Sequence, residues 1–260
     1  MRFMQAKFKV THPRNPAWKS ELLPGLIQND YRTSTYEKCV EDLRFLRYSL
    51  DFGQSFRRCS EIHAFTVMTH RMLGPIMEYM YWINPKNLND WTRLWYSKHV
   101  PPLMSVWYIY RRKQKAVELV KIHENIDESQ DFYMKEYFKK HAKECFEMLS
   151  ARLGSGDFFF DTPCSLDCVV YSYLAPLIKI PFPSDEVSQI LRTFNNLVAY
   201  VHRIDINYQP ELVEDRLKML PLKKPEEDDM ASLKLKIFSS IFVACAMFGY
   251  ALANKIISFH

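Results

Sequence analysis

The fold is decided by the stretch ARLGSGDFFFDTPCSLDCVVYSYLAPLIKIPFPS, residues 151–184. Gly154 suits the left-handed position that follows the last turn of a helix, so it predicts the end of a preceding helix. A new helix is expected after Pro163. If Cys164 is its N-cap, Asp167 stands three residues into the helix, where a carboxylate accepts a free backbone N–H and complements the helix dipole. We therefore predict structural roles for Pro163, Cys164 and Asp167.

Helical spacing of apolar residues continues on both sides of this stretch. Upstream it predicts helices only from about residue 60, with a kink at Pro75 and a helix opening at Pro101-Pro102. Downstream it predicts one last helix over about 185–203. The apolar stripes are Phe65, Met68, Met72, Ile76, Tyr79 and Met80; Leu88, Trp91 and Trp95; Phe138, Ala142, Phe146, Leu149 and Leu153; and Ile190, Leu191, Phe194, Leu197, Val198 and Val201. We interpret them as core packing rather than a cofactor pocket, because the spacing is purely helical.

The N-terminal quarter carries weaker signals. Alternation at Lys7-Phe8-Lys9-Val10 predicts a strand over 7–12, and the capping box of Ser34 and Glu37 predicts a helix over 34–48. The first twenty residues are basic and lack acids, which also occurs in mitochondrial transit peptides. Prolines at positions 13 and 16 would interrupt an amphipathic helix there, so the strand is the favoured reading.

Composition excludes little and suggests helical packing. The 260 residues include 15% aromatics and only 6 Gly, and the formal net charge of +5 is too small to indicate nucleic-acid binding. The basic run at 111–115 is interpreted as a solvated helix face, with an anionic partner site as the alternative. His63 and His70 are read as packed or surface groups.

Six cysteines occur, without any CxxC pair. Cys164 and Cys168 are one helical turn apart, but no His or second Cys pair accompanies them at zinc spacing. We interpret the cysteines as core thiols in a reducing compartment, with a metal site as the alternative.

A C-terminal segment, residues 237–253, holds no charged residue, although 25% of the whole chain is charged. As a helix it would be about 26 Å long, at the short end of what spans a hydrocarbon core of about 30 Å. Lys234, Lys236 and Lys255 could reach the headgroups from its two ends. We predict a transmembrane tail anchor, with a buried core helix as the alternative. The predicted membrane-anchor residues are Ile237, Phe238, Ile241, Phe242, Val243, Ala246, Met247, Phe248, Gly249, Tyr250 and Leu252.

Several of these stretches together carry a family resemblance. Residues 151–184, followed by NNLVAYVHRI at 195–204, resemble the C-terminal core of the metaxins. YWINPKNLNDWTRLWYSKHVPPL at 81–103, NPAWKS at 15–20 and LPGL at 23–26 resemble the type-one metaxin in particular. The resemblance covers nearly the whole chain and includes the apolar C-terminal segment.

The resemblance implies a mainly α, glutathione-transferase-like fold. It divides the chain into an incomplete thioredoxin-like αβ part (1–55), an all-helical domain (56–206), a charged Pro-containing linker (207–232) and a transmembrane tail anchor (233–257). The opening strand of a thioredoxin-like unit, which carries the thiol-activating residue in transferases, has no counterpart before residue 7. Pro24 in LPGL matches the cis-proline of that fold, and we assign it a structural role rather than a thiol-binding one.

One position departs from the transferase pattern. Transferases of this fold commonly place Ser or Thr at the helix N-cap where this chain has Cys164. A thiol accepts hydrogen bonds poorly, so this cap should be weaker by up to about 1 kcal/mol unless Ser165 takes over.

The resemblance also implies a function. Metaxins are non-enzymatic subunits of the machinery that sorts and assembles β-barrel proteins in the mitochondrial outer membrane. The expected partners are other metaxins, the β-barrel core subunit of that machinery and the lipid bilayer, with the bulk of the chain facing the cytosol. No catalytic residue, cofactor, metal, nucleic acid or small-molecule substrate is expected. The alternatives are an outer-membrane adaptor for cytosolic or motor proteins and a glutathione-dependent membrane enzyme.

Overall fold

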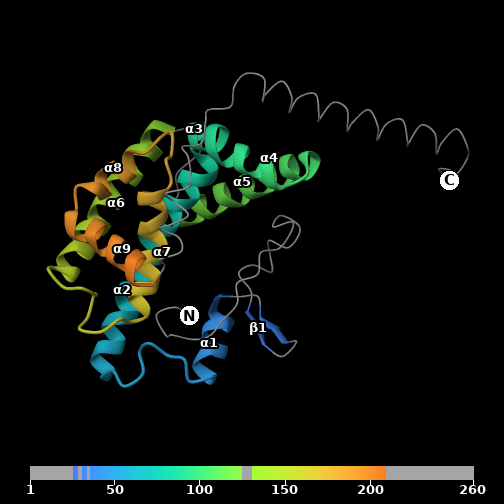
Figure 1. Cartoon of the computed structure of the whole chain (residues 1–260). Coiled ribbons are helices and arrows are strands. Elements are labelled where there is room, and N and C mark those ends of the chain that lie inside the picture. The colour runs from blue at the N-terminus through green and yellow to red at the C-terminus, as the bar shows by residue number, and fades with distance from the viewer. Residues whose placement is uncertain (1–25, 29–30, 34–35, 125–130, 209–260) are drawn as a thin grey trace, which may run out of the picture.

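A computed structural model of the chain describes residues 26–28, 31–33, 36–124 and 131–208 (Figure 1). Its first elements are two short strands, β1 (Leu26–Gln28) and β2 (Tyr31–Thr33), which pair antiparallel with Leu26 opposite Thr33. Helix α1 (Tyr36–Phe45) follows. The Thr33 hydroxyl donates to the Asp42 carboxylate, so a side-chain bond holds this helix to the hairpin.

All other described elements are helices. They are α2 (Phe56–Glu78), the π-helical turn η2 (Tyr79–Ile83), α3 (Pro85–Asn87), the π-helical turn η3 (Leu88–Thr92), α4 (Arg93–His99), α5 (Pro102–Glu124), α6 (Asp131–Leu153), α7 (Ser165–Lys179), α8 (Glu186–Arg192) and α9 (Asn195–Tyr208).

Helix α7 lies at the centre of the bundle. It packs against α2, α8 and α9, while α6 packs against α2, α8 and α9 from the other side (Figure 1). Their shared core is apolar, and its fully buried members include Leu73, Phe146, Leu149, Leu174 and Val201. Helices α4 and α5 form a hairpin that projects to one side of this bundle, and α5 packs only on α2, η2 and α4 among the main described neighbours. One face of α5 is therefore left outside the core.

Three helix boundaries confirm the sequence predictions. Helix α6 ends at Leu153, and Gly154 follows with a φ of 56°, in the left-handed region. Helix α5 begins at Pro102, and α7 begins directly after its N-cap Cys164. Proline in a first turn and glycine after a last turn are thus correctly placed by local backbone chemistry.

The helix predicted over 34–48 is wrong at its C-terminal end, because α1 stops at Phe45. Arg47 adopts a φ of 64°, its N–H donates to Arg44, and the Tyr48 N–H donates to the Leu43 carbonyl at 2.8 Å. These two bonds form a Schellman motif. Arginine replaces the usual glycine in it, so the sequence carried no stop signal.

The single helix predicted over 185–203 is also wrong. The chain breaks between α8 and α9, and the Thr193 hydroxyl bonds back to the Ile190 carbonyl at 2.7 Å. Asn196, in the first turn of α9, donates to the carbonyls of Ser150 and Gly154 at 3.0 and 3.1 Å. A tertiary contact with the end of α6 therefore sets the start of α9.

The predicted stripe of Leu88, Trp91 and Trp95 is wrong at Trp95, which is 40% exposed while Leu88 is buried. The π-helical turns η2 and η3 close their hydrogen bonds one residue further along the chain than an α-helix does. The extra residues rotate the following side chains out of the expected phase.

Several predictions fall outside the described residues. They are the strand over 7–12, the capping residue Ser34, Pro24, residues 209–232 of the linker and the C-terminal apolar segment. Among the residues that the structure describes, no helix is both long and apolar enough to cross a membrane.

Candidate functional site

The start of α7 is a buried polar junction centred on Asp167, whose side chain is fully buried. Its Oδ2 accepts the Cys164 backbone N–H at 2.8 Å, which confirms the predicted cap. Its Oδ1 accepts the Phe159 N–H at 3.2 Å and the Tyr200 hydroxyl at 3.1 Å. One carboxylate therefore joins the loop before α7, α7 itself and α9, and its role is structural.

Burial is the main influence on ionisation at this junction. It raises the pKa of Asp167 against the opposing effect of its hydrogen bonds, and it raises the pKa of Tyr200 well above the ordinary value. Burial and the nearby Asp167 carboxylate also raise the pKa of the Cys164 thiol. A thiol in such a site is a poor nucleophile, because the reactive species is the thiolate.

Two further cysteines, one buried and one partly buried, also have raised pKa values. Burial raises the pKa of Cys145 to about 12 and that of Cys168 to about 11. Within the described ranges no three His, Cys, Asp or Glu side chains gather as a metal site would require. Cys145 and Cys164, which are buried, therefore fit the interpretation as core thiols, whereas Cys39, Cys59 and Cys168 are only partly buried.

Asp51 is a structural residue that the sequence did not reveal. Its Oδ1 accepts the backbone N–H of Ser165 at 2.9 Å, across 114 positions of sequence. Arg58 strengthens the same contact with an ion pair to Asp161 at 2.7 Å. The segment between α1 and α2 thus satisfies a free N–H at the start of α7 in addition to Asp167. Because the capping residue is so far from α7 in the sequence, no motif around α7 could have indicated it.

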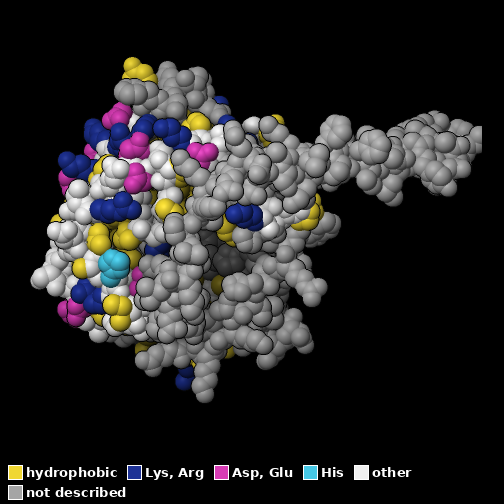
Figure 2. All heavy atoms as spheres, turned by 45° about the horizontal axis from the view of Figure 1, so that its top comes forward, with side chains coloured by type: hydrophobic (Ala, Val, Ile, Leu, Met, Phe, Trp, Pro, Cys, Tyr) yellow, Lys and Arg dark blue, Asp and Glu magenta, His cyan; other side chains and the backbone are white. Residues whose placement is uncertain are grey.

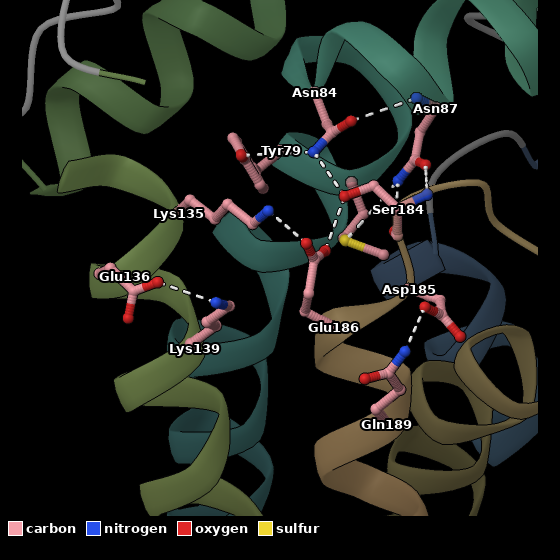
Figure 3. Close-up of polar contacts among 11 residues, drawn as sticks. Tyr79, Asn84, Asn87, Lys135, Glu136, Lys139, Ser184, Asp185, Glu186 and Gln189 are labelled. Carbon is pink, nitrogen blue, oxygen red and sulfur yellow. Dashed lines mark hydrogen bonds and ion pairs between the residues drawn. The ribbon is translucent and has the colours of Figure 1, made fainter. Parts of the chain in front are cut away.

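A second buried network lies between α3 and the loop before α8 (Figure 3). The Ser184 N–H donates to Asn87 Oδ1 at 2.7 Å, and Asn87 Nδ2 donates back to the Ser184 carbonyl at 3.0 Å. Asn84 Nδ2 donates to Ser184 Oγ at 3.2 Å and its Oδ1 accepts the Asn87 N–H. The side-chain amides of Asn84 and Asn87 thus hold α3 against the loop before α8, and their buried polar atoms have hydrogen-bond partners.

Glu186 extends this network to α6. Its Oε2 accepts the Ser184 hydroxyl at 2.6 Å, and its Oε1 pairs with Lys135 (Figure 3). Partial burial acts to raise the pKa of Glu186, but the hydrogen bonds from Lys135 and Ser184 outweigh it and hold the pKa at about 2. The network is an ionised, hydrogen-bonded brace between α6 and α8.

A third cluster closes the other end of α7. Lys179 contacts both the carboxylate of Asp205 and the hydroxyl of Tyr171, the latter at 2.6 Å. Tyr171 also donates to Asp205, which is almost fully buried. Since a buried carboxylate needs a paired cation, this triad joins α7 to α9 rather than offering a reactive group.

Unlike these buried polar clusters, the α4–α5 hairpin has large apolar and aromatic side chains exposed at its surface. Val106, Trp107 and Tyr110 of α5 are 56%, 56% and 65% exposed. The Arg111 guanidinium lies 5.3 Å from the Trp107 ring centroid, at cation–π distance. Large aromatic side chains in such exposed positions contribute little to the core, so this face is the candidate interaction surface.

Figure 2 gives a contrast with another part of the described surface. On its upper left, Lys and Arg side chains are intermingled with Asp and Glu. Mixed charges of this kind are ordinary solvated surface and produce no field of a single sign. The exposed aromatic side chains on α5 are therefore the better candidate for binding a partner than this mixed-charge surface.

Comparison with known proteins first identifies the class. Residues 142–204, which include the end of α6, α7, α8 and most of α9, match the family model described as glutathione S-transferase, C-terminal domain. This part of the helical bundle is therefore similar to a transferase C-terminal domain. Residues 1–114 match a second family model, described as outer mitochondrial membrane transport complex protein.

The relatives identify the family. The chain is 32% identical to Metaxin-1 of Mus musculus over 99% of its own length and 83% of the relative's. It is 33% identical to Metaxin-1 of Macaca fascicularis over the same shares. Metaxin-3 of Danio rerio is 30% identical over 74% of this chain and 62% of its own length. The chain belongs to the metaxin family. No solved structure matches it significantly.

Proposed function

We propose that this protein is a non-enzymatic subunit of the mitochondrial outer-membrane machinery that imports and assembles β-barrel proteins. The observation that carries the proposal is the similarity to Metaxin-1 relatives over 99% of the chain. The match of residues 1–114 to an outer mitochondrial membrane transport complex family supports the same assignment. The partners would be a second metaxin and the β-barrel core subunit of the machinery.

The proposal includes a division of labour along the chain. A thioredoxin-like part (1–55) and the helical domain (56–206) would form a cytosolic platform. The linker (207–232) would separate this platform from the tail anchor (233–257). The uncharged run at 237–253, with lysines at both ends, supports a spanning helix.

The non-enzymatic part of the proposal is supported by the chemistry of the described residues. Asp167 and Tyr200 bond to each other, as do Tyr171 and Asp205, and burial suppresses the nucleophilicity of Cys145, Cys164 and Cys168. These contacts hold helices together, and the burial of these three thiols opposes nucleophilic chemistry at them. Full-length protein should give no conjugation of glutathione to a generic electrophile above a heat-denatured control.

The decisive experiment is a mild-detergent pull-down of the full chain from mitochondria. Recovery of the β-barrel core subunit together with a second metaxin is expected. Recovery of transport or cytoskeletal proteins alone would instead support the adaptor function.

The anchor has a test of its own. Ala246→Arg places a charge in the middle of the span and should cost about 2.5–3.5 kcal/mol of insertion free energy. Ala253→Arg, at the edge of the same segment, is the matched control, since the side chain can reach the headgroups. Carbonate extraction should release the Ala246→Arg protein and a 233–260 deletion, but not the control. A carbonate-resistant Ala246→Arg protein would mean that the segment is a packed core helix.

A further inference from the structure

The net charge of the protein is concentrated in one region. Residues 91–117, which contain α4 and most of α5, include no Asp or Glu, while the whole chain has 35 Lys and Arg against 30 Asp and Glu. This region, which we call the basic hairpin, contains six of the cations: Arg93, Lys98, Arg111, Arg112, Lys113 and Lys115. The remainder of the chain thus has 29 basic and 30 acidic residues, so the basic hairpin accounts for the entire excess of positive charge.

Aromatic residues are concentrated in the same region. It contains Trp91, Trp95 and Trp107, three of the five tryptophans of the chain. Tyr96 and Tyr108 stack on each other with ring centroids 5.1 Å apart, and both contact the buried Trp82. The inner aromatic rings thus fasten the hairpin to the bundle and make it a rigid support for the outer ones.

Along the outer face of α5, apolar and aromatic side chains come first and polar or basic side chains follow. Val106, Trp107 and Tyr110 occupy its first turns as exposed apolar and aromatic groups. Arg111, Gln114 and Lys115 continue the same exposed face by one and two further turns. An aromatic end followed by a basic stretch is an amphipathic surface, although the helix as a whole is anchored in the bundle by Ile109, Ala116 and Val120.

We infer that this face of the basic hairpin lies against an anionic lipid surface, with Trp107 and Tyr110 at the level of the headgroups. Tryptophan and tyrosine prefer that level because their rings are apolar with one polar end. Lysine and arginine near them gain from the negative potential of anionic lipids. A second copy of the chain fits less well, because two such faces would repel each other.

The inference deepens the proposed function, since a tail anchor would hold the helical domain close to a membrane. It adds an orientation: the hairpin side of the domain faces the bilayer, and α9 on the far side of α7 faces the cytosol. In this arrangement the exposed aromatic face of α5 is covered by lipid, which explains its exposure in the isolated chain.

The test reads residue 107 by fluorescence in the full chain bound to vesicles. The fluorescence of the Trp107→Phe protein comes from the other four tryptophans. Subtracting it from the fluorescence of the unaltered chain gives the emission of Trp107. The vesicles contain brominated phosphatidylcholine, with or without phosphatidylglycerol. We expect the emission of Trp107 to shift to the blue and to be quenched, more strongly when phosphatidylglycerol is present. Lys115→Glu should weaken the quenching.

The matched control is Ile206→Trp in the Trp107→Phe background. Ile206 is 66% exposed on α9, which lies away from α5, so its emission should stay unquenched. Equal quenching at positions 107 and 206 would overturn the proposed orientation. Absence of quenching at position 107 would overturn the lipid contact and leave an acidic protein segment as the occupant of this face.

A second experiment distinguishes failure of the lipid contact at α5 from failure of the C-terminal anchor. The full chain is tethered through an N-terminal histidine tag to a nickel-chelating lipid, so that Trp107 is read whether or not the C-terminal segment inserts. If the C-terminal segment is not an anchor, carbonate should release the untagged protein from membranes, but Trp107 of the tethered protein should still be quenched. Failure of the inference would show as an unquenched Trp107 on a chain that stays bound to the vesicles.

Discussion

The start of α7 and the face of α5 use polar and aromatic residues in opposite ways. Around α7, Asp167 and Tyr200 are fully buried and bond to groups from three separate parts of the chain. On α5, Trp107 and Tyr110 are more than half exposed and contribute little to the core. Buried polar groups must be satisfied internally, so they specify the fold, whereas exposed aromatics are available to a partner.

The comparison predicts its largest effect at Asp167. Asp167→Ala would leave the Phe159 and Cys164 N–H groups without their acceptor in a fully buried site, while the Tyr200 hydroxyl would keep only the Asp167 backbone carbonyl at 3.1 Å. Unsatisfied buried donors cost about 1–3 kcal/mol each and are not additive, so we expect a loss of roughly 2–4 kcal/mol of unfolding free energy. Urea unfolding of the full chain in mild detergent measures it.

Cys164→Ser is the control for that measurement. It keeps the backbone N–H that Asp167 accepts and should be neutral or stabilising, because a hydroxyl is a better cap than a thiol. If Asp167→Ala unfolds at the same urea concentration as the unaltered chain, the junction does not hold α7 in the way described.

A smaller effect is expected at Asp51. Asp51→Ala removes the acceptor of the Ser165 N–H and should cost about 1 kcal/mol, as for other helix caps. Asp161→Ala tests the neighbouring ion pair with Arg58, which is largely exposed and should contribute less than 1 kcal/mol. A loss for Asp161→Ala as large as that for Asp51→Ala would contradict the expectation that the cap from Asp51 contributes more than the ion pair made by α2.

The pH dependence of stability should differ in sign between Glu186 and Asp167. The pKa of Glu186 is lowered to about 2, so its contribution is full above its ordinary pKa and is lost as the pH falls toward 2. The pKa of Asp167 is raised, so the folded state binds a proton more tightly and stability falls as the pH rises through that pKa.

Two isosteric variants measure these effects. Relative to the unaltered chain, Glu186→Gln should lose stability at neutral pH and recover it on acidification. The Asp167→Asn difference should grow in favour of the unaltered chain on acidification. Urea midpoints between neutral pH and pH 3 would report both, and parallel curves for all three proteins would contradict the assignment.

The smallest effect on folding is expected at the surface of α5. Trp107→Ala and Tyr110→Ala should each change the unfolding free energy by no more than about 0.5 kcal/mol, as is usual for exposed positions. A loss as large as that of Asp167→Ala would mean that this face is part of the core, and it would remove the contrast between the two regions.

The sequence alone determined those features that depend on short-range chemistry. Proline at position 102, glycine at 154 and the pair Cys164 and Asp167 act on backbone groups within a few residues, so the start of α5, the end of α6 and the start of α7 were predicted correctly. The helical class followed from local apolar spacing, and the family followed from the resemblance of several stretches to the metaxins.

Tertiary structure decided the features that depend on groups far apart in the chain. Asp51 caps α7 across 114 positions, Asn196 joins the start of α9 to the end of α6, and the π-helical turns move Trp95 to the surface. The basic run at 111–115 was visible as a charge pattern, but only packing showed which face of α5 remains exposed. The physical reason is that a side chain's local preferences act within one or two turns, whereas its burial and its hydrogen-bond partners depend on which distant segments pack beside it.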